Sequence, residues 1–361
     1  MIVRPLVVPV FISHAGCPYR CVFCNQKIVT NHSPTAPHPG LIDAALDTYL
    51  APALRRPARI EISFYGGTFL GLPQETVQQL LGAAQVQVDS GRVDALRFST
   101  RPDTVDSRSL AAIAPFSVGT VEVGVQSMDD AVLARARRGH SASASRRAVA
   151  LLKGAGYRVG VQLMVGLPAE SEAGLARTLA ATAEMMPDFV RIYPTLVLPD
   201  SVLAGWHQAG RYIPLSLSQA VARTKSMFSF FYRRKIPVVR MGLQPTDSLS
   251  AAVAGGEVAG PYHPAFGHLV HETLFLEAAS LLLKRSILST TVIKVHPASI
   301  SVMRGLGNAN SVHLKAHFGL RELAVVGDKE LAVGAISIGG RTLDAFAGVP
   351  EGRLCPPALA Q

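Results

Sequence analysis

The chain has 361 residues, of which 48% are hydrophobic and 17% charged. This balance excludes an intrinsically disordered protein, and the length allows one large domain and a smaller one. The formal net charge of +10 suits a polyanionic partner such as nucleic acid, although the basic residues are scattered in small groups.

The first predicted element is an apolar stretch over residues 1–13, which we interpret as a buried strand. Arg4, Pro5 and Pro9 interrupt it, so it is too short to span a membrane, and it lacks the pattern of a signal peptide. We therefore expect a cytoplasmic protein with no membrane partner.

Further strands alternate with helices as far as residue 193. The predicted strands cover residues 59–64, 95–100, 120–125, 157–165 and 189–193, and the predicted helices cover 41–54, 73–88, 129–137, 143–154 and 171–186. Strands that alternate with helices pair in parallel through right-handed crossovers, so the expected class is α/β. Functional residues should then follow the carboxyl ends of the strands.

The C-terminal third has a different order of elements. We expect helices at 216–234, 267–285 and 308–317, and strands at 291–296, 322–327 and 331–338. Glycines 255, 256 and 260 mark a linker before them. The prediction is a core domain over residues 1–250 and a smaller α+β domain over residues 251–361, available for substrate recognition.

Three of the four cysteines lie within eight residues, as Cys17, Cys21 and Cys24. Soft thiolates at this spacing favour an iron–sulfur cluster, in which three cysteines leave one iron without a protein ligand. A zinc site is the first alternative, with His14 or His32 as the fourth ligand. A disulfide with one spare thiol is the second. Cys355 stands alone near the C-terminus, and we assign it no role.

This CxxxCxxC loop, with Phe23 before its last cysteine, resembles that of radical S-adenosylmethionine (SAM) enzymes. The resemblance implies a partial (β/α)6 TIM-like barrel and a 4Fe-4S cluster held by the three cysteines. It also implies that SAM is cleaved to a 5'-deoxyadenosyl radical, with a one-electron reductant of the flavodoxin or ferredoxin class as partner.

Motifs after the predicted strands extend the resemblance over residues 7–215. Gly66-Gly67-Thr68 is similar to the family motif that contacts the SAM amino group, since glycines let the backbone approach a ligand. Ser99 and Arg101 follow the third strand, and Ser99 stands where a ribose-binding glutamate is common. The resemblance makes Ser99 a ribose contact, whereas Arg101 is either a SAM contact or an ion-pair partner.

The fourth and fifth strands end in related motifs. Gln126 and Arg138 belong to a segment similar to the GVQS…RGH of Elongator catalytic subunits. This resemblance implies that both residues face SAM and that the arginine binds the carboxylate of SAM. Gln162 takes the position of a ribose-binding aspartate in oxygen-independent coproporphyrinogen oxidases. As structural alternatives, Gln126 begins a helix and Arg138 belongs to a basic face.

The resemblance to Elongator subunits and the basic charge favour RNA or tRNA as substrate. The acetyl-CoA loop of the Elongator acetyltransferase domain is not found in the last 100 or so residues, so carboxymethyl-uridine formation is not expected. A small-molecule or cofactor-biosynthesis enzyme is the second hypothesis. The third is a non-catalytic iron–sulfur or zinc protein, because Ser99 and Gln162 replace carboxylates.

Overall fold

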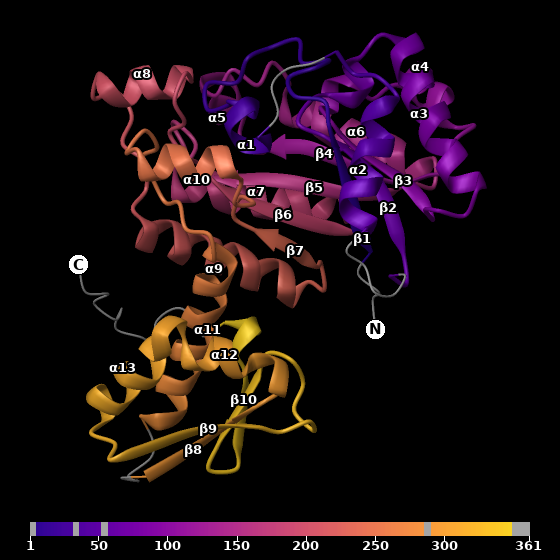
Figure 1. Ribbon diagram of the computed structural model, residues 1–361. Helices are drawn as coiled ribbons and strands as arrows, with labels where there is room; N and C mark the ends of the chain where they lie inside the picture. The colour runs from indigo at the N-terminus through magenta and orange to yellow at the C-terminus, as the bar shows by residue number, and fades with distance from the viewer. Residues whose placement is uncertain (1–4, 32–35, 52–56, 285–289, 349–361) are drawn as a thin grey trace. The chain divides into compact units, whose positions relative to one another are not determined.

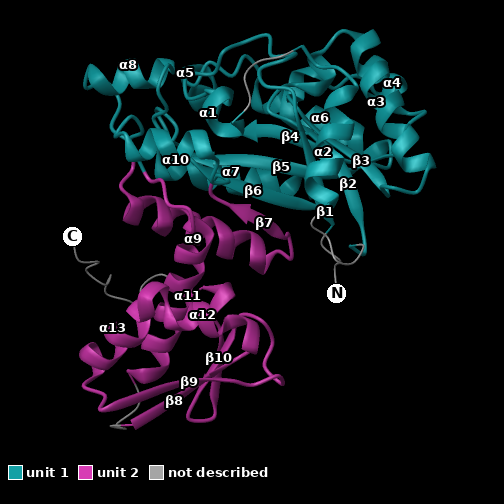
Figure 2. Ribbon diagram, viewed as in Figure 1, with its two compact units in different colours: residues 1–214, 243–260 teal, residues 215–242, 261–361 magenta. Residues whose placement is uncertain are grey.

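The computed structural model describes residues 5–31, 36–51, 57–284 and 290–348 (Figure 1). The chain divides into two compact units, of which the first comprises residues 1–214 and 243–260 and the second the remainder (Figure 2). The predicted boundary at residue 250 falls inside helix α10 (Asp247–Ala254) of the first unit. The first unit is therefore discontinuous in sequence.

The first unit contains six strands that pair in chain order, every neighbouring pair being parallel. They are β1 (Leu6–Phe11), β2 (Ile60–Tyr65), β3 (Ala95–Thr100), β4 (Val118–Gln126), β5 (Arg158–Val165) and β6 (Phe189–Pro194). Helices connect them (Figure 1). This arrangement confirms the predicted α/β class and the partial (β/α)6 barrel.

The two faces of this sheet differ in chemistry because side chains alternate along each strand. Apolar residues such as Ile62, Phe98 and Val161 are fully buried, while the alternate positions carry many polar side chains. Arg191 on β6 donates a hydrogen bond to the Tyr65 hydroxyl on β2 over 3.0 Å, although three strands separate β2 from β6. Only a curled sheet allows this bond, so the polar side chains occupy its concave side.

Several helices of the first unit begin at side-chain caps. The Ser141 and Ser171 side chains accept hydrogen bonds from the third backbone N–H of α6 and α7, which satisfies otherwise unpaired donors. The helices are α1 (Gln26–Thr30), α2 (Gly40–Leu50), α3 (Gln74–Asp89), α4 (Ser107–Ile113), α5 (Asp130–Arg135), α6 (Ala142–Gly154), α7 (Glu172–Glu184), α8 (Val202–Gln208) and α10. The sequence analysis did not predict α1, α4, α8 or α10. Each has no more than eight residues, too few to show a clear helical period.

The second unit contains a mixed four-stranded sheet in the order β11-β10-β8-β9. Its strands are β8 (Thr290–Val295), β9 (Glu322–Gly327), β10 (Ala335–Ile338) and β11 (Arg341–Asp344). The remaining elements are α9 (Leu217–Arg233), β7 (Val238–Met241), α11 (Phe266–Leu283), α12 (Ile300–Arg304) and α13 (Ala309–Phe318). Phe275, Ile293 and Ile336 share one apolar core of this unit. The predicted strand 331–338 was too long, because Gly334 adopts a positive φ of 98° and ends a turn there. The smaller α+β domain is present, but the unit also includes residues 215–242, which the sequence analysis gave to the core domain, and α12 and β11 were not predicted.

Within the described ranges, none of the helices is both long and apolar enough to cross a lipid bilayer.

Candidate functional site

The cysteine loop leaves the carboxyl end of β1 and lies directly against the Gly66-Gly67-Thr68 turn that follows β2. The His14 N–H donates to the Gly66 carbonyl over 2.9 Å, and the Thr68 N–H donates to the Ala15 carbonyl over 2.8 Å. A Cβ atom at Gly67 would lie 2.4 Å from the Ala15 carbonyl oxygen, closer than atoms can pack. The double glycine therefore allows the loop backbone itself to approach.

The three cysteines of the loop are free thiols, and each has a polar neighbour. Cys17 Sγ lies 3.2 Å from Thr68 Oγ1, and Cys24 Sγ accepts a hydrogen bond of 3.4 Å from the Gln26 amide. Cys21 is buried, and its Sγ accepts a hydrogen bond of 3.1 Å from Arg138 Nη1. These contacts fix the direction of each sulfur.

The surroundings of two of the thiols change their acidity. Burial raises the pKa of Cys24 to about 12, and repulsion from Cys21 and Cys17 adds to the rise. Desolvation by the surrounding loop raises the pKa of Cys17 as well, and the hydrogen bond with Thr68 and the charges of Arg101 and Arg138 partly offset this rise. Since metal ligands must be thiolates, binding of a metal centre here would release protons.

Among the described residues, no three His, Cys, Asp or Glu side chains converge closely enough to hold a single metal ion. An iron–sulfur cluster differs because each cysteine ligates its own iron. His14, a fourth ligand in the zinc alternative, has its Nε2 engaged in accepting the Gln26 N–H over 3.1 Å. His32, the other candidate for that ligand, lies outside the described residues, as does Cys355.

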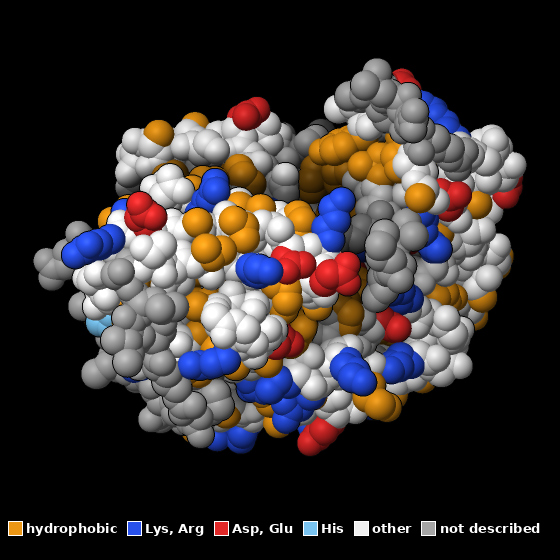
Figure 3. Space-filling view, turned by 90° about the horizontal axis from the view of Figure 1, so that it is seen from below, with side chains coloured by type: hydrophobic (Ala, Val, Ile, Leu, Met, Phe, Trp, Pro, Cys, Tyr) orange, Lys and Arg blue, Asp and Glu red, His pale blue; other side chains and the backbone are white. Residues whose placement is uncertain are grey.

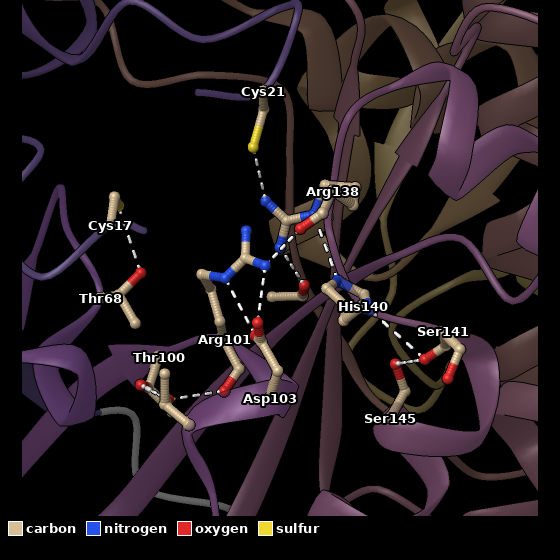
Figure 4. A network of polar contacts seen from close by, with 12 residues as sticks. Cys17, Cys21, Thr68, Thr100, Arg101, Asp103, Arg138, His140, Ser141 and Ser145 are labelled. Atoms are coloured by element: carbon tan, nitrogen blue, oxygen red, sulfur yellow. Dashed lines mark hydrogen bonds and ion pairs between the residues drawn. The ribbon is translucent and has the colours of Figure 1, made fainter. Parts of the chain in front are cut away.

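Two buried arginines lie next to the thiols (Figure 4). Arg138 uses all three guanidinium nitrogens: Nη1 donates to Cys21 Sγ, Nε donates to His140 Nε2 over 3.2 Å, and Nη2 donates to the Gly124 carbonyl over 2.6 Å. Burial and the Arg138 charge lower the pKa of His140 to about 4, so the imidazole is neutral at neutral pH and its nitrogen is free to accept.

Arg101 is held differently. Its Nε and Nη2 donate to the two carboxylate oxygens of Asp103 over 2.9 and 2.8 Å, and Nη2 also donates to the Arg138 carbonyl. Its Nη1 is buried and has no hydrogen-bond partner among the described residues. The Tyr19 ring covers the guanidinium, with its centroid 5.1 Å away. An unpaired buried donor costs about 1–3 kcal/mol, so this nitrogen is suited to an acceptor that the protein itself does not provide.

Gln126 ends β4 in a conformation that side chains rarely adopt, with φ of 67°. A register shift between Val123 and Gln126 sets it there. The residue is 8% exposed, and its Oε1 has no hydrogen-bond partner among the described residues. Strain combined with an unpaired buried acceptor is typical of a ligand-binding position.

Two predicted cofactor residues lie near the centre of the barrel. Gln162 donates to the Glu122 carboxylate over 3.1 Å. Ser99 is partly buried and lies opposite Glu122 in the register of β3 and β4. Both therefore lie close to a carboxylate that the sequence analysis did not single out.

Glu122 is fully buried and receives hydrogen bonds and ion pairs from three further side chains. The Tyr65 hydroxyl donates to Glu122 Oε1 over 2.7 Å, and Arg97 Nη1 lies 3.2 Å from the same oxygen. Arg191 Nε lies 2.8 Å from the other oxygen, Oε2. Despite complete burial, the two arginines hold the pKa of Glu122 below its usual value. A signal for this cluster was present, because polar residues alternate with apolar ones in the middle of these strands, as at Arg97 and Ser99 on β3 and Thr120 and Glu122 on β4.

Comparison with known proteins gives a consistent result. The family described as Radical SAM superfamily matches residues 11–181, and the Radical_SAM C-terminal domain matches residues 187–275. The tRNA uridine(34) acetyltransferase of Dehalococcoides mccartyi is 28% identical over 277 residues, 66% of this chain and 60% of that protein. Elongator complex protein 3 of Homo sapiens is 29% identical over 229 residues, 54% of this chain and 41% of that protein. The chain thus spans about half the length of the curated relatives it matches.

Among solved structures, the archaeal Methanocaldococcus infernus Elp3 with an N-terminal deletion superposes with a TM-score of 0.58. It is 22% identical, and the match covers 80% of this chain and 69% of that one. At this identity the similarity concerns the fold.

Proposed function

The chain belongs to the radical SAM superfamily of enzymes, and we propose that Cys17, Cys21 and Cys24 bind its 4Fe-4S cluster. Enzymes of this superfamily use that cluster together with SAM. When both are bound, the cluster and SAM supply a 5'-deoxyadenosyl radical. The observation that supports this assignment most is the presence of three free thiols on one short loop at the carboxyl end of β1.

Residues around the thiols would hold SAM. Gly66 and Gly67 keep the cysteine loop against the end of β2, and the Thr68 hydroxyl orients Cys17. The unpaired Oε1 of Gln126 is suited to accept from a ribose hydroxyl or an amino group. Ser99 and Gln162 are less direct candidates for ribose contacts, because the Gln162 amide already binds Glu122.

The experiment is anaerobic reconstitution with iron and sulfide, followed by addition of SAM and dithionite and measurement of 5'-deoxyadenosine. The wild type should form it, and Cys17→Ala, Cys21→Ala and Cys24→Ala should not. Cys355→Ala is the matched control, because it removes a thiol outside the loop. Full production by Cys21→Ala would disprove the assignment. A loaded cluster that leaves SAM intact even with substrate present would indicate a non-catalytic protein.

We further propose RNA, and tRNA in particular, as the substrate class. Two relatives are a tRNA uridine acetyltransferase and an Elongator protein, and the net charge of +10 suits a polyanion. On the face drawn in Figure 3, basic side chains stand in several separate groups with acidic ones between them. Attraction would then come from the overall charge as well as from local contacts.

Binding of bulk tRNA at several salt concentrations tests this proposal. Contacts to phosphates release counterions, so the logarithm of the association constant should fall linearly with the logarithm of the salt concentration. A flat or absent binding curve would favour a small-molecule substrate instead. We also propose that the protein is cytoplasmic and that a flavodoxin or ferredoxin is its electron donor. The second unit would take part in recognising the substrate.

A further inference from the structure

An exposed aromatic ring stands on the cysteine loop. Tyr19 lies between Cys17 and Cys21, and 51% of the residue is exposed. A tyrosine in this state gives up much of the apolar burial that usually stabilises an aromatic side chain. Its exposed surface is therefore available to a partner that comes close to the thiols.

One face of the ring is covered by the protein. A Cβ atom at Gly139 would lie 2.5 Å from two ring carbons, so the glycine backbone packs directly on the ring. The Arg101 guanidinium lies 5.1 Å from the ring centroid and donates to the carbonyl of Arg138, the residue bonded to Gly139. Both contacts are thus on the same side of the ring, and the exposed surface is on the other side.

The ring is also held in a fixed position. Residues 136–139 run along the cysteine loop, because the Val22 N–H donates to the Ala136 carbonyl over 3.1 Å at one end and Tyr19 packs on Gly139 at the other. Gly139 has a φ of 73°, so both its conformation and its contact with the ring favour glycine. A ring that is already in place loses little conformational freedom when a ligand stacks on it.

Two exposed arginines flank the ring, one on each of the segments that hold it. Arg20 follows Tyr19 in the cysteine loop, and Arg137 lies two residues before Gly139. Neither arginine forms an ion pair with a residue that the structure describes. An aromatic ring between two available positive charges matches the two groups that single-stranded nucleic acid presents, the bases and the phosphates.

We propose that Tyr19 is a stacking platform for an unpaired base of an RNA substrate, and that Arg20 and Arg137 contact the adjoining phosphates. This inference rests on the proposed RNA substrate and adds the place at which the RNA meets the cysteine loop. Bases within a double helix already stack on one another, so the platform requires a single-stranded segment such as a loop. The net charge of +10 attracts the RNA, and Tyr19 fixes one base beside the thiols.

The two kinds of contact predict two different changes. Loss of one base–aromatic stack should weaken binding of single-stranded RNA about tenfold in Tyr19→Leu, whereas Tyr19→Phe should stay within about threefold of the wild type. Stacking releases no counterions, so Tyr19→Leu should keep the salt dependence of the wild type. Arg20→Gln and Arg137→Gln should each reduce the slope of the logarithm of the association constant against the logarithm of salt concentration by about 0.7, the value for one phosphate contact on a single strand.

The experiment uses the full-length reconstituted protein under anaerobic conditions. Fluorescence anisotropy measures its binding to labelled bulk tRNA and to a short single-stranded RNA of uridines. Tyr49→Leu is the matched control, because Tyr49 is also exposed, at 42%, but lies on α2 and makes no cation–π contact with a described residue. Arg108→Gln is the control for charge, because Arg108 is exposed on α4 and bonds to Gln74. The iron content shows whether each variant still loads its cluster.

A second measurement needs no substitution, so it decides the matter if Tyr19→Leu fails to fold. RNA that contains iodouridine crosslinks on irradiation to an aromatic ring that stacks on this base. Mass spectrometry of the crosslinked wild-type protein should identify the peptide that contains Tyr19. Crosslinks confined to other peptides would overturn the inference.

The outcomes separate this inference from the proposed function. If Tyr19→Leu keeps its iron and binds RNA as tightly as Tyr49→Leu, the platform is wrong although the proposed RNA substrate stands. If equilibrium dialysis shows that Tyr19→Leu loses affinity for SAM but not for RNA, the ring contacts the cofactor and the inference is also wrong. If the wild type binds neither RNA probe, the proposed substrate fails and the platform fails with it. Formation of 5'-deoxyadenosine tests the cluster assignment separately.

Discussion

Replacement of Glu122 by glutamine should destabilise the first unit strongly. The carboxylate is fully buried and accepts from Tyr65, Arg97, Arg191 and Gln162. Glutamine has nearly the same volume, so the substitution leaves no cavity. It removes the negative charge between one buried and one partly buried guanidinium group, and it turns one acceptor oxygen into an N–H donor that faces other donors.

The size of the effect follows from this arrangement. Removal of one partner from a buried ion pair costs about 3–5 kcal/mol, because the other charge stays buried without compensation. Arg97 keeps the Glu61 carboxylate as a second partner, while Arg191 keeps the Tyr65 hydroxyl. These remaining contacts place the expected loss near the lower end, about 3 kcal/mol. That is a large fraction of the about 5–15 kcal/mol that stabilises a typical protein.

Urea unfolding followed by the fluorescence of Trp206 measures this loss. Trp206 is the only tryptophan and lies in the first unit. Glu184→Gln is the control, because Glu184 forms an exposed pair with Arg146 and should lose less than about 1 kcal/mol. Suppose that Glu122→Gln loses no more free energy of unfolding than this control, and that the dependence of this free energy on urea concentration is unchanged. The buried network then does not stabilise the barrel as argued.

Three further predictions concern pH, the loop and a helix cap. Because the folded state lowers the pKa of His140 from 6.5 to about 4, the unfolded chain binds a proton more readily, so stability should fall as the pH drops from about 6.5 to 4. His140→Gln should reduce this acid sensitivity in urea midpoints measured across that range. Gly67→Ala should displace the cysteine loop and lower the iron content after reconstitution, whereas Gly82→Ala, with nothing near its Cβ, should not. Ser216→Ala should cost about 1 kcal/mol by removing the capping box with Gln219, and Ser216→Asp should largely restore the stability. Urea unfolding followed by circular dichroism measures this, because α9 lies in the second unit and Trp206 in the first.

The sequence predicted the elements whose pattern is local. The strand at residues 95–100 was placed to the residue, because alternation and Pro102 define it. The strand-end positions of Arg101 and Gln126 were also correct, since parallel strands bring their carboxyl ends to one edge. The residues around a glycine pair do not show which distant part of the chain the pair will contact. The sequence did not predict that Gly67 packs against the cysteine loop, and its approach to a ligand stays a prediction.

Contacts that depend on curvature were not predictable from the pattern. Tyr65 and Arg191 are 126 residues apart, and they meet only because the sheet curls. The contact of Arg138 with Cys21 spans 117 residues and depends on the fold of two loops. The residue types were visible in the sequence, but their partners were set by tertiary structure. The family resemblance could therefore not show that Arg138 also bonds to Cys21, and its contact with SAM stays a prediction.

The discontinuity of the first unit affects the order in which the protein is completed during synthesis. Helix α10 packs on α1, the helix that directly follows the cysteines in the chain. The Thr246 hydroxyl donates to the Ile28 carbonyl over 3.0 Å. The ribosome makes Ile28 more than 200 residues before this partner. A nascent chain that ends at residue 214 has all three cysteines and six strands but lacks this support. The loop is therefore complete only after residues 243–260 have emerged, so metal insertion should follow translation of most of the chain.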